Sequence, residues 1–170
     1  IAWKKKLLIE LQTVPTLQAL QPWQTEQLIS GYGMRINRFH KGMYEHAGVD
    51  ISMPRGTEIV ATAVGTVSVV KRSDLQAGYG NYIEIDHGQG FVTRYAHLEE
   101  IKVRTGQKVN KGTAIATIGS SGGSVAPHLH YEIIFRGKNA DPSLFMMEGL
   151  SSDEHHQLKL VSHNQNQSLD

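Results

Sequence analysis

Short apolar, β-branched runs separated by turn-forming residues constrain the fold of this chain more than any other feature. Such runs fill the middle of the sequence, at residues 58–70, 81–86, 91–98, 114–118 and 130–135. Glycine, asparagine and aspartate stand between them, which is typical of short strands joined by tight turns. The pattern predicts a mainly β fold, with an antiparallel sandwich or barrel-like core.

The two ends of the sequence differ from this middle. Residues 24–29 are predicted to form one short helix, and Ser151 and Glu154 have the spacing of a capping box that begins another. We therefore expect short helices at both ends and three parts in the chain: an N-terminal extension, partly helical or linker, over 1–29; a domain over 30–148; and a C-terminal helix with a polar tail over 149–170.

Length and composition narrow the class of protein. A chain of 170 residues suits one domain better than two, and a net charge of +1 gives no basic field for nucleic acid. The absence of cysteine excludes disulfides and thiolate metal sites. The apolar run that ends at Ile9 is far shorter than the roughly 20 residues of a membrane span. Because the chain begins at Ile1 rather than methionine, we expect a processed form or a fragment.

A histidine and an aspartate, His46 and Asp50, stand four residues apart. On a helix they would share a face, but Gly48 disfavours a helix and Val49 and Ile51 favour a strand. We interpret the segment as a loop that enters a strand, with Gly48 allowing a bend that turns both side chains toward one point. The sequence contains no His-Glu-x-x-His, which excludes the helical zincin motif.

Two further histidines, His128 and His130, begin a run that is typical of a strand. Side chains alternate along a strand, so both are predicted to share one face, roughly 6.5–7 Å apart. The opposite face is predicted to pack in the core through Leu129, Tyr131, Ile133 and Phe135. His97 ends another alternating stretch, in which it should share a face with Phe91, Thr93 and Tyr95, and it reaches the same place only if the two strands are neighbours.

These residues offer the ligands of a catalytic metal. Zinc in such sites typically takes three protein ligands, and His46, Asp50 and His130 make such a set. A non-haem iron site also uses two histidines and a carboxylate, but nothing in the sequence indicates an oxygenase. For His87, which stands between Asp86 and Gly88 in a predicted turn, we favour a structural role.

Three motifs, in this order, resemble the lysostaphin-like family of zinc endopeptidases: His46-x-x-x-Asp50, Tyr95-Ala96-His97-Leu98 and His128-x-His130. The resemblance runs from about Ser30 to Pro142 and includes the segments 78–81 and 119–122. It implies a compact antiparallel β core with a groove along one sheet. It also implies a zinc peptidase, located in the periplasm or cell envelope, that cuts stem or cross-bridge peptides of bacterial peptidoglycan.

The resemblance also implies roles for individual residues. His46, Asp50 and His130 would bind Zn²⁺, while His97 and His128 would deprotonate the attacking water and steady the tetrahedral intermediate. Arginine binds carboxylates bidentately, so Arg35 is a candidate for holding an anionic stem peptide. The full set of expected substrate-binding residues is Arg35, Asn37, Tyr95, Ser120 and Ser121.

Alternatives remain at this point. Some relatives have lost their ligands and activate other wall hydrolases; here, that role would require a groove blocked by residues 1–29 or by a missing pro-region. The segments 63–67 and 106–113 resemble the hairpins of biotinyl and lipoyl carrier domains, but the flanking residues of a modified lysine are absent. Members of the family cut either glycine bridges or D-amino-acid cross-links. The segments 31–35 and 166–170 resemble Gram-negative relatives and favour the D-alanyl cross-link.

Overall fold

The computed structural model describes Pro15, Ala19 and residues 28–30, 33–36, 43–124 and 126–142. Within these ranges the chain forms short antiparallel strands joined by tight turns, as the sequence predicts. The strands are β1 (Leu28–Ser30), β2 (Gly33–Ile36), β3 (Met43–His46), β4 (Val49–Ser52), β5 (Glu58–Val60), β6 (Gly65–Lys71), β7 (Tyr82–Gly88), β8 (Phe91–Ala96), β9 (Leu98–Ile101), β10 (Lys108–Val109), β11 (Ala114–Ile118), β12 (His128–Phe135) and β13 (Lys138–Ala140).

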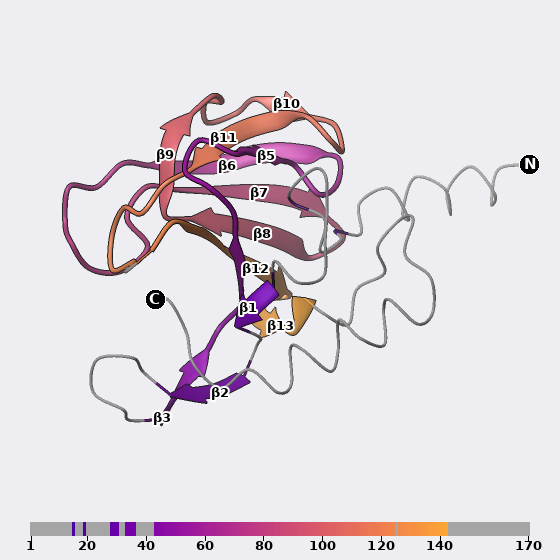
Figure 1. Ribbon diagram of the computed structural model, residues 1–170. Helices are drawn as coiled ribbons and strands as arrows, with labels where there is room; N and C mark the ends of the chain where they lie inside the picture. The colour runs from indigo at the N-terminus through magenta and orange to yellow at the C-terminus, as the bar shows by residue number, and fades with distance from the viewer. Residues whose placement is uncertain are drawn as a thin grey trace, which may run out of the picture.

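The strands form three sheets (Figure 1). The largest has eight strands in the order β1-β4-β12-β8-β7-β6-β10, with β13 paired to β12. A three-stranded sheet has the order β5-β11-β9, and β2 pairs with β3 in a hairpin that lies apart from the larger sheets at the bottom of the view. The mainly β, antiparallel fold that the sequence predicts is thereby confirmed.

The hydrophobic core lies between the two larger sheets. Fully buried side chains of the large sheet, among them Ile83, Ile85 and Tyr131, belong to one cluster with Ile59 and Ile115 of the small sheet. Along β12 the predicted alternation holds for the residues that pack in this core: Leu129, Tyr131 and Ile133 are each 0% exposed. The other face of β12 is therefore the face that carries His128 and His130.

Phe135 departs from the predicted packing. It is the last residue of β12 and is 37% exposed, so it lies at the edge of the core rather than inside it. Its ring contacts the ring of Phe91 on the paired strand, with 4.6 Å between their centroids. The strand ends here at the Arg136–Gly137 turn, where solvent reaches the sheet.

The predicted N-terminal helix is wrong where it meets described residues. Leu28 and Ile29 belong to β1, which pairs with β4, because the edge of the large sheet supplies hydrogen-bond partners to their backbone. Residues 24–27 and the predicted C-terminal helix lie outside the described residues. No helix among the described residues is long and apolar enough to cross a membrane.

His87 has the structural role that we favoured, although it lies in β7 just before a turn rather than within one. Its side chain is 3% exposed, Nδ1 donates to the backbone oxygen of Val64 at 2.9 Å, and Nε2 lies 2.7 Å from Oγ1 of Thr93. Burial lowers the pKa of this imidazole, and the hydrogen bond to Val64 offsets that effect only partly. His87 is therefore buried in its neutral form.

We expect this buried imidazole to destabilise the fold in acid. The unfolded chain takes up a proton near pH 6.5, whereas the folded chain does so only at lower pH, so this contribution to stability is full above pH 6.5 and is lost as the pH falls below it. Urea unfolding of the metal-free protein between pH 7.5 and 5.5 measures the slope. His87→Gln should flatten it by up to about 1.4 kcal/mol per pH unit; parallel slopes for the two proteins would contradict the assignment.

Candidate metal centre

The turn between β3 and β4 places two of the candidate ligands. His46 ends β3, Asp50 lies in β4, and Ala47 and Gly48 connect them. A Cβ on Gly48 would collide with the backbone oxygen of Tyr131 and would lie 2.8 Å from Cγ of Glu132. The predicted bend at Gly48 is confirmed, although His46 ends a strand rather than lying in a loop. Glycine is required because the chain passes so close to β12.

The third candidate ligand comes from the neighbouring strand. β12 lies between β4 and β8, and His130 stands opposite Asp50 on one side and Ala96 on the other. Residues that stand opposite each other in an antiparallel sheet share a face. His130 and Asp50 therefore meet on the face of the large sheet that points away from the core.

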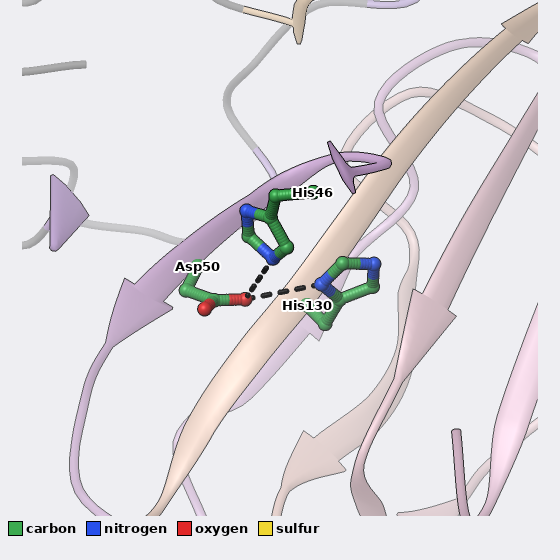
Figure 2. A group of neighbouring side chains, drawn as sticks. All are labelled: His46, Asp50 and His130. Atoms are coloured by element: carbon green, nitrogen blue, oxygen red, sulfur yellow. Dashed lines mark hydrogen bonds and ion pairs between the residues drawn. The ribbon is translucent and has the colours of Figure 1, made fainter. Parts of the chain in front are cut away.

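The three side chains converge on one point (Figure 2). Nε2 of His46 lies 3.3 Å from Oδ1 of Asp50, Nδ1 of His130 lies 3.0 Å from the same oxygen, and the three ligand atoms are all within 4.8 Å of one another. Bonds of about 2.1 Å to a tetrahedral zinc ion would separate ligand atoms by about 3.4 Å. All three side chains are buried. Their spacing and their donor atoms fit a zinc ion.

His128 stands beside this cluster, two residues before His130 on the same face of β12. Its Nε2 lies 3.5 Å from Oδ1 of Asp50, while its Nδ1 donates to the backbone oxygen of Ala126 at 2.8 Å and lies 3.0 Å from Oγ of Ser124. A neutral imidazole that donates from Nδ1 carries its lone pair on Nε2. The basic nitrogen of His128 therefore faces the cluster.

His97 reaches the cluster through an unusual backbone conformation. It lies between β8 and β9 with φ of 62°, in the left-handed region. Its Nδ1 donates to the backbone oxygen of Ser121 at 2.7 Å, and its ring centroid lies 4.8 Å from that of His128 and 6.0 Å from that of His130. The predicted adjacency of the strands β8 and β12 is confirmed. The left-handed backbone conformation of His97 turns its side chain toward the cluster.

Tyr95 does not share a face with His97, contrary to the prediction from the alternating pattern. Its side chain is 0% exposed and its ring lies 5.3 Å from that of Tyr131 in the core. Its hydroxyl is hydrogen-bonded to Thr62 and Thr93, and burial raises its pKa. The alternation that holds up to Tyr95 ends at His97, so the expected contact of Tyr95 with substrate is wrong.

A cleft of about 290 Å³ includes the two expected serines, and the backbone oxygen of one of them, Ser121, accepts the hydrogen bond from His97. Oγ of Ser120 accepts a 2.6 Å hydrogen bond from Arg55, whereas Oγ of Ser121 donates to the backbone oxygen of Leu98 at 2.9 Å and thereby holds the loop in place. Arg35 lies in β2, in a part whose side chains are not described, and Asn37 lies outside the described residues. The cleft is lined by Arg55, Asn81, Leu98, Glu99, Gly119, Ser120 and Ser121.

Sequence reasoning missed a buried carboxylate, Glu132, behind the cluster. It is 0% exposed, and its Oε2 lies 2.7 Å from Nε2 of His130. Burial opposes its ionisation, but hydrogen bonds from His130 and from the Tyr79 hydroxyl, together with the Arg94 charge, lower its pKa to about 2. The sequence does contain an indication of this role: Glu132 is two residues after His130 in the same predicted strand, so both side chains are expected on one face.

A protein-family model matches most of the described residues. The model of peptidase family M23 matches residues 44–142, which lie inside the predicted domain 30–148. The outer limits of that domain remain a prediction.

Two relatives are similar over much of this chain. Peptidoglycan DD-endopeptidase ShyA of Vibrio cholerae is 42% identical over 104 residues, which are 61% of this chain and 24% of ShyA. Murein hydrolase activator NlpD of Salmonella dublin is 36% identical over 143 residues, which are 79% of this chain and 37% of NlpD. The matches therefore span about a quarter of the length of ShyA and somewhat more than a third of the length of NlpD.

Solved structures agree with the fold. A zinc-containing peptidase from Vibrio cholerae is 32% identical with a TM-score of 0.62, over 76% of this chain and 38% of that one. The catalytic domain of lysostaphin from Staphylococcus simulans is also 32% identical, with a TM-score of 0.58, over 66% of this chain and 85% of that one. The resemblance to lysostaphin-like peptidases that the motifs indicate is thereby confirmed.

Proposed function

Because the chain belongs to peptidase family M23, we propose that it is a zinc-dependent endopeptidase that hydrolyses peptide cross-links of bacterial peptidoglycan. One observation carries the proposal: the buried cluster of His46, Asp50 and His130 has the two imidazoles of His97 and His128 beside it. This arrangement combines a complete ligand set with groups that can move a proton.

The ligand chemistry favours zinc as the metal. The cluster offers Nε2 of His46, an anionic oxygen of Asp50 and Nδ1 of His130, a mixture of nitrogen and oxygen donors that suits zinc. When bound in such a site, zinc lowers the pKa of water to about 7 and acts as a Lewis acid toward a carbonyl oxygen.

The two remaining histidines supply the proton transfers. Nε2 of His128 accepts a proton from the attacking water as the oxygen of that water bonds to the carbonyl carbon. The proton then passes to the leaving amine nitrogen as the carbon–nitrogen bond breaks. His97, whose Nδ1 donates to the backbone oxygen of Ser121, presents Nε2 as its second basic nitrogen; once Nε2 has taken a proton, it donates to the oxygen that gains negative charge at the tetrahedral stage.

The cleft lined by Ser120 and Ser121 favours a substrate with charged groups. Arg55 and Glu99 line it and lie 3.8 Å apart at their charged atoms, so both signs are available to a peptide. Stem peptides carry free carboxylates and amines. Since ShyA is a DD-endopeptidase and is 42% identical to this chain over 104 residues, we propose the D-amino-acid cross-link, rather than a glycine bridge, as the bond that is cut. With such a substrate, we propose that the protein acts outside the cytoplasm, in the periplasm or cell envelope.

A second candidate function is that of an activator of other wall hydrolases, favoured by the likeness to NlpD. The intact ligand set favours the enzyme, because an activator has no need of it. The activator prediction required residues 1–29 or a missing pro-region to block the groove. Almost all of residues 1–29 lie outside the described residues. The carrier-domain interpretation is set aside, since the family match includes both hairpins on which it was based.

Removal of the metal should abolish hydrolysis. We expect metal-free protein, prepared with a chelator and desalted, to release soluble fragments from purified sacculi more than about 100-fold more slowly than the loaded protein, because the metal contributes several kcal/mol. One equivalent of zinc should restore the rate, and magnesium should not. Undiminished release by metal-free protein would contradict the proposal, and zinc binding without release would favour the activator.

A further inference from the structure

We propose that Glu132 is a positioning residue that fixes His130 as a metal ligand through Nδ1, and that it connects His130 to the turn that carries His46. This inference rests on the proposed zinc site. It concerns the residues behind the ligands rather than the ligands themselves.

The ring of His130 lies between two buried carboxylates. Its Nδ1 faces Oδ1 of Asp50 at 3.0 Å, in the cluster, and its Nε2 faces Oε2 of Glu132 at 2.7 Å, behind it. Both carboxylates are 0% exposed. A carboxylate that accepts the proton of Nε2 leaves the lone pair on Nδ1 and makes that nitrogen a stronger donor to a metal. Glu132 therefore determines which nitrogen of His130 binds.

Glu132 is itself held in one orientation. Oε2 also accepts from the hydroxyl of Tyr79 at 2.7 Å, and Oε1 accepts from Nη1 of Arg94 at 2.8 Å. The guanidinium of Arg94 stacks over the ring of Tyr79, 4.8 Å from its centroid, and pairs with Glu84 at 3.2 Å. Because both carboxylate oxygens are engaged, Glu132 presents a fixed acceptor to His130.

One further contact extends this arrangement to the other ligands. The side-chain amide of Asn139, in β13, donates to Oε1 of Glu132 at 3.0 Å and to the backbone oxygen of Ala47 at 2.9 Å. Ala47 follows His46 in the turn that leads to Asp50. The amide has two protons, so it can satisfy both acceptors at once. Glu132 thus connects the β12 ligand with the turn that carries the other two.

A purely structural role for Glu132 would be to neutralise the half-buried Arg94. Glu84 allows the two roles to be distinguished, because it also forms an ion pair with Arg94. It lies in β7, which pairs with β8 and not with β12, the strand of His130. If Glu132 acts only through Arg94, then Glu84→Gln and Glu132→Gln should have similar effects. If Glu132 acts on His130, only Glu132→Gln should weaken metal binding.

Zinc affinity, measured by competition with a chromophoric chelator, tests the proposal without reference to activity. We expect Glu132→Gln to raise the zinc dissociation constant about 10–100-fold, the usual effect of losing an outer partner of a ligand histidine, and Glu84→Gln to change it less than about threefold. Circular dichroism establishes that each variant is folded. Equal effects of the two variants, or a Glu132→Gln affinity within threefold of wild type, would overturn the proposal.

A measurement on the unmodified protein keeps the proposal falsifiable if Glu132→Gln does not fold. Long-range proton–nitrogen correlation spectra of the zinc-loaded chain should show His130 protonated at Nε2 and metal-bound at Nδ1. The opposite assignment would overturn the proposal. A wild-type chain that binds no zinc would instead overturn the proposed function and this inference with it, which distinguishes the two failures.

Discussion

Replacing Asp50 with alanine is expected to lower zinc affinity more than about 100-fold, a larger effect on metal binding than that of Glu132→Gln. Losing an outer partner of a ligand already costs about 10–100-fold, and Asp50 is proposed as a direct ligand. Its Oδ1 lies 3.0–3.5 Å from nitrogens of His46, His128 and His130, so the cluster also loses its one anionic oxygen. Zinc per chain, determined by elemental mass spectrometry after desalting, measures the effect.

The matched control is Asp86→Ala, which removes an exposed aspartate from β7. It should bind one zinc per chain, as the wild type does. Unchanged zinc stoichiometry in Asp50→Ala would remove Asp50 from the ligand set and would require a different carboxylate, of which Glu132 is the buried candidate nearest to His130.

His128→Ala is expected to retain zinc and to lose turnover, the second large effect. General acid–base catalysis contributes about 100- to 10,000-fold, so kcat should fall by a factor in that range. Zinc stoichiometry should not change, because His46, Asp50 and His130 remain in place. Peptide hydrolysis and zinc content, measured on the same preparation, separate a proton-transfer role from a ligand role.

Ser124→Ala provides a graded comparison for His128. Oγ of Ser124 lies 3.0 Å from Nδ1 of His128, but the backbone oxygen of Ala126 accepts from the same nitrogen at 2.8 Å and would still orient the ring. We therefore expect a loss of activity of less than about tenfold for Ser124→Ala. Loss of zinc from His128→Ala, or activity within twofold of wild type, would contradict the proposed role of His128.

Local patterns in the sequence were enough to predict several parts of the candidate site. The spacing of His128 and His130 in a β-branched run places both on one face of a strand, and the structure agrees. Gly48 between His46 and Asp50 indicated a bend, and the structure adds its cause, the close passage of this turn over β12. Such features depend only on neighbours in the chain.

Other parts depend on contacts between segments that are distant in the sequence. His130 and Asp50 are 80 residues apart and meet because β12 lies between β4 and β8, an order that no local pattern reveals. His97 has a left-handed backbone conformation that ends the alternation along this strand, and no glycine or asparagine at this position indicates it in the sequence. The prediction therefore assigned Tyr95 to the wrong face. The helix predicted to end at Ile29 is wrong at Leu28 and Ile29, which form part of β1 because the edge of the large sheet supplies hydrogen-bond partners to their backbone.

Mass spectrometry of cross-linked muropeptides tests the proposed cleavage of peptidoglycan cross-links by this chain. Zinc-loaded protein is incubated with purified dimeric muropeptides, and His128→Ala is treated in parallel. We expect monomeric products, formed only by the intact chain, with masses that correspond to a cut at the D-amino-acid cross-link. Dimers left uncleaved by a chain that binds zinc, or equal cleavage by His128→Ala, would contradict it.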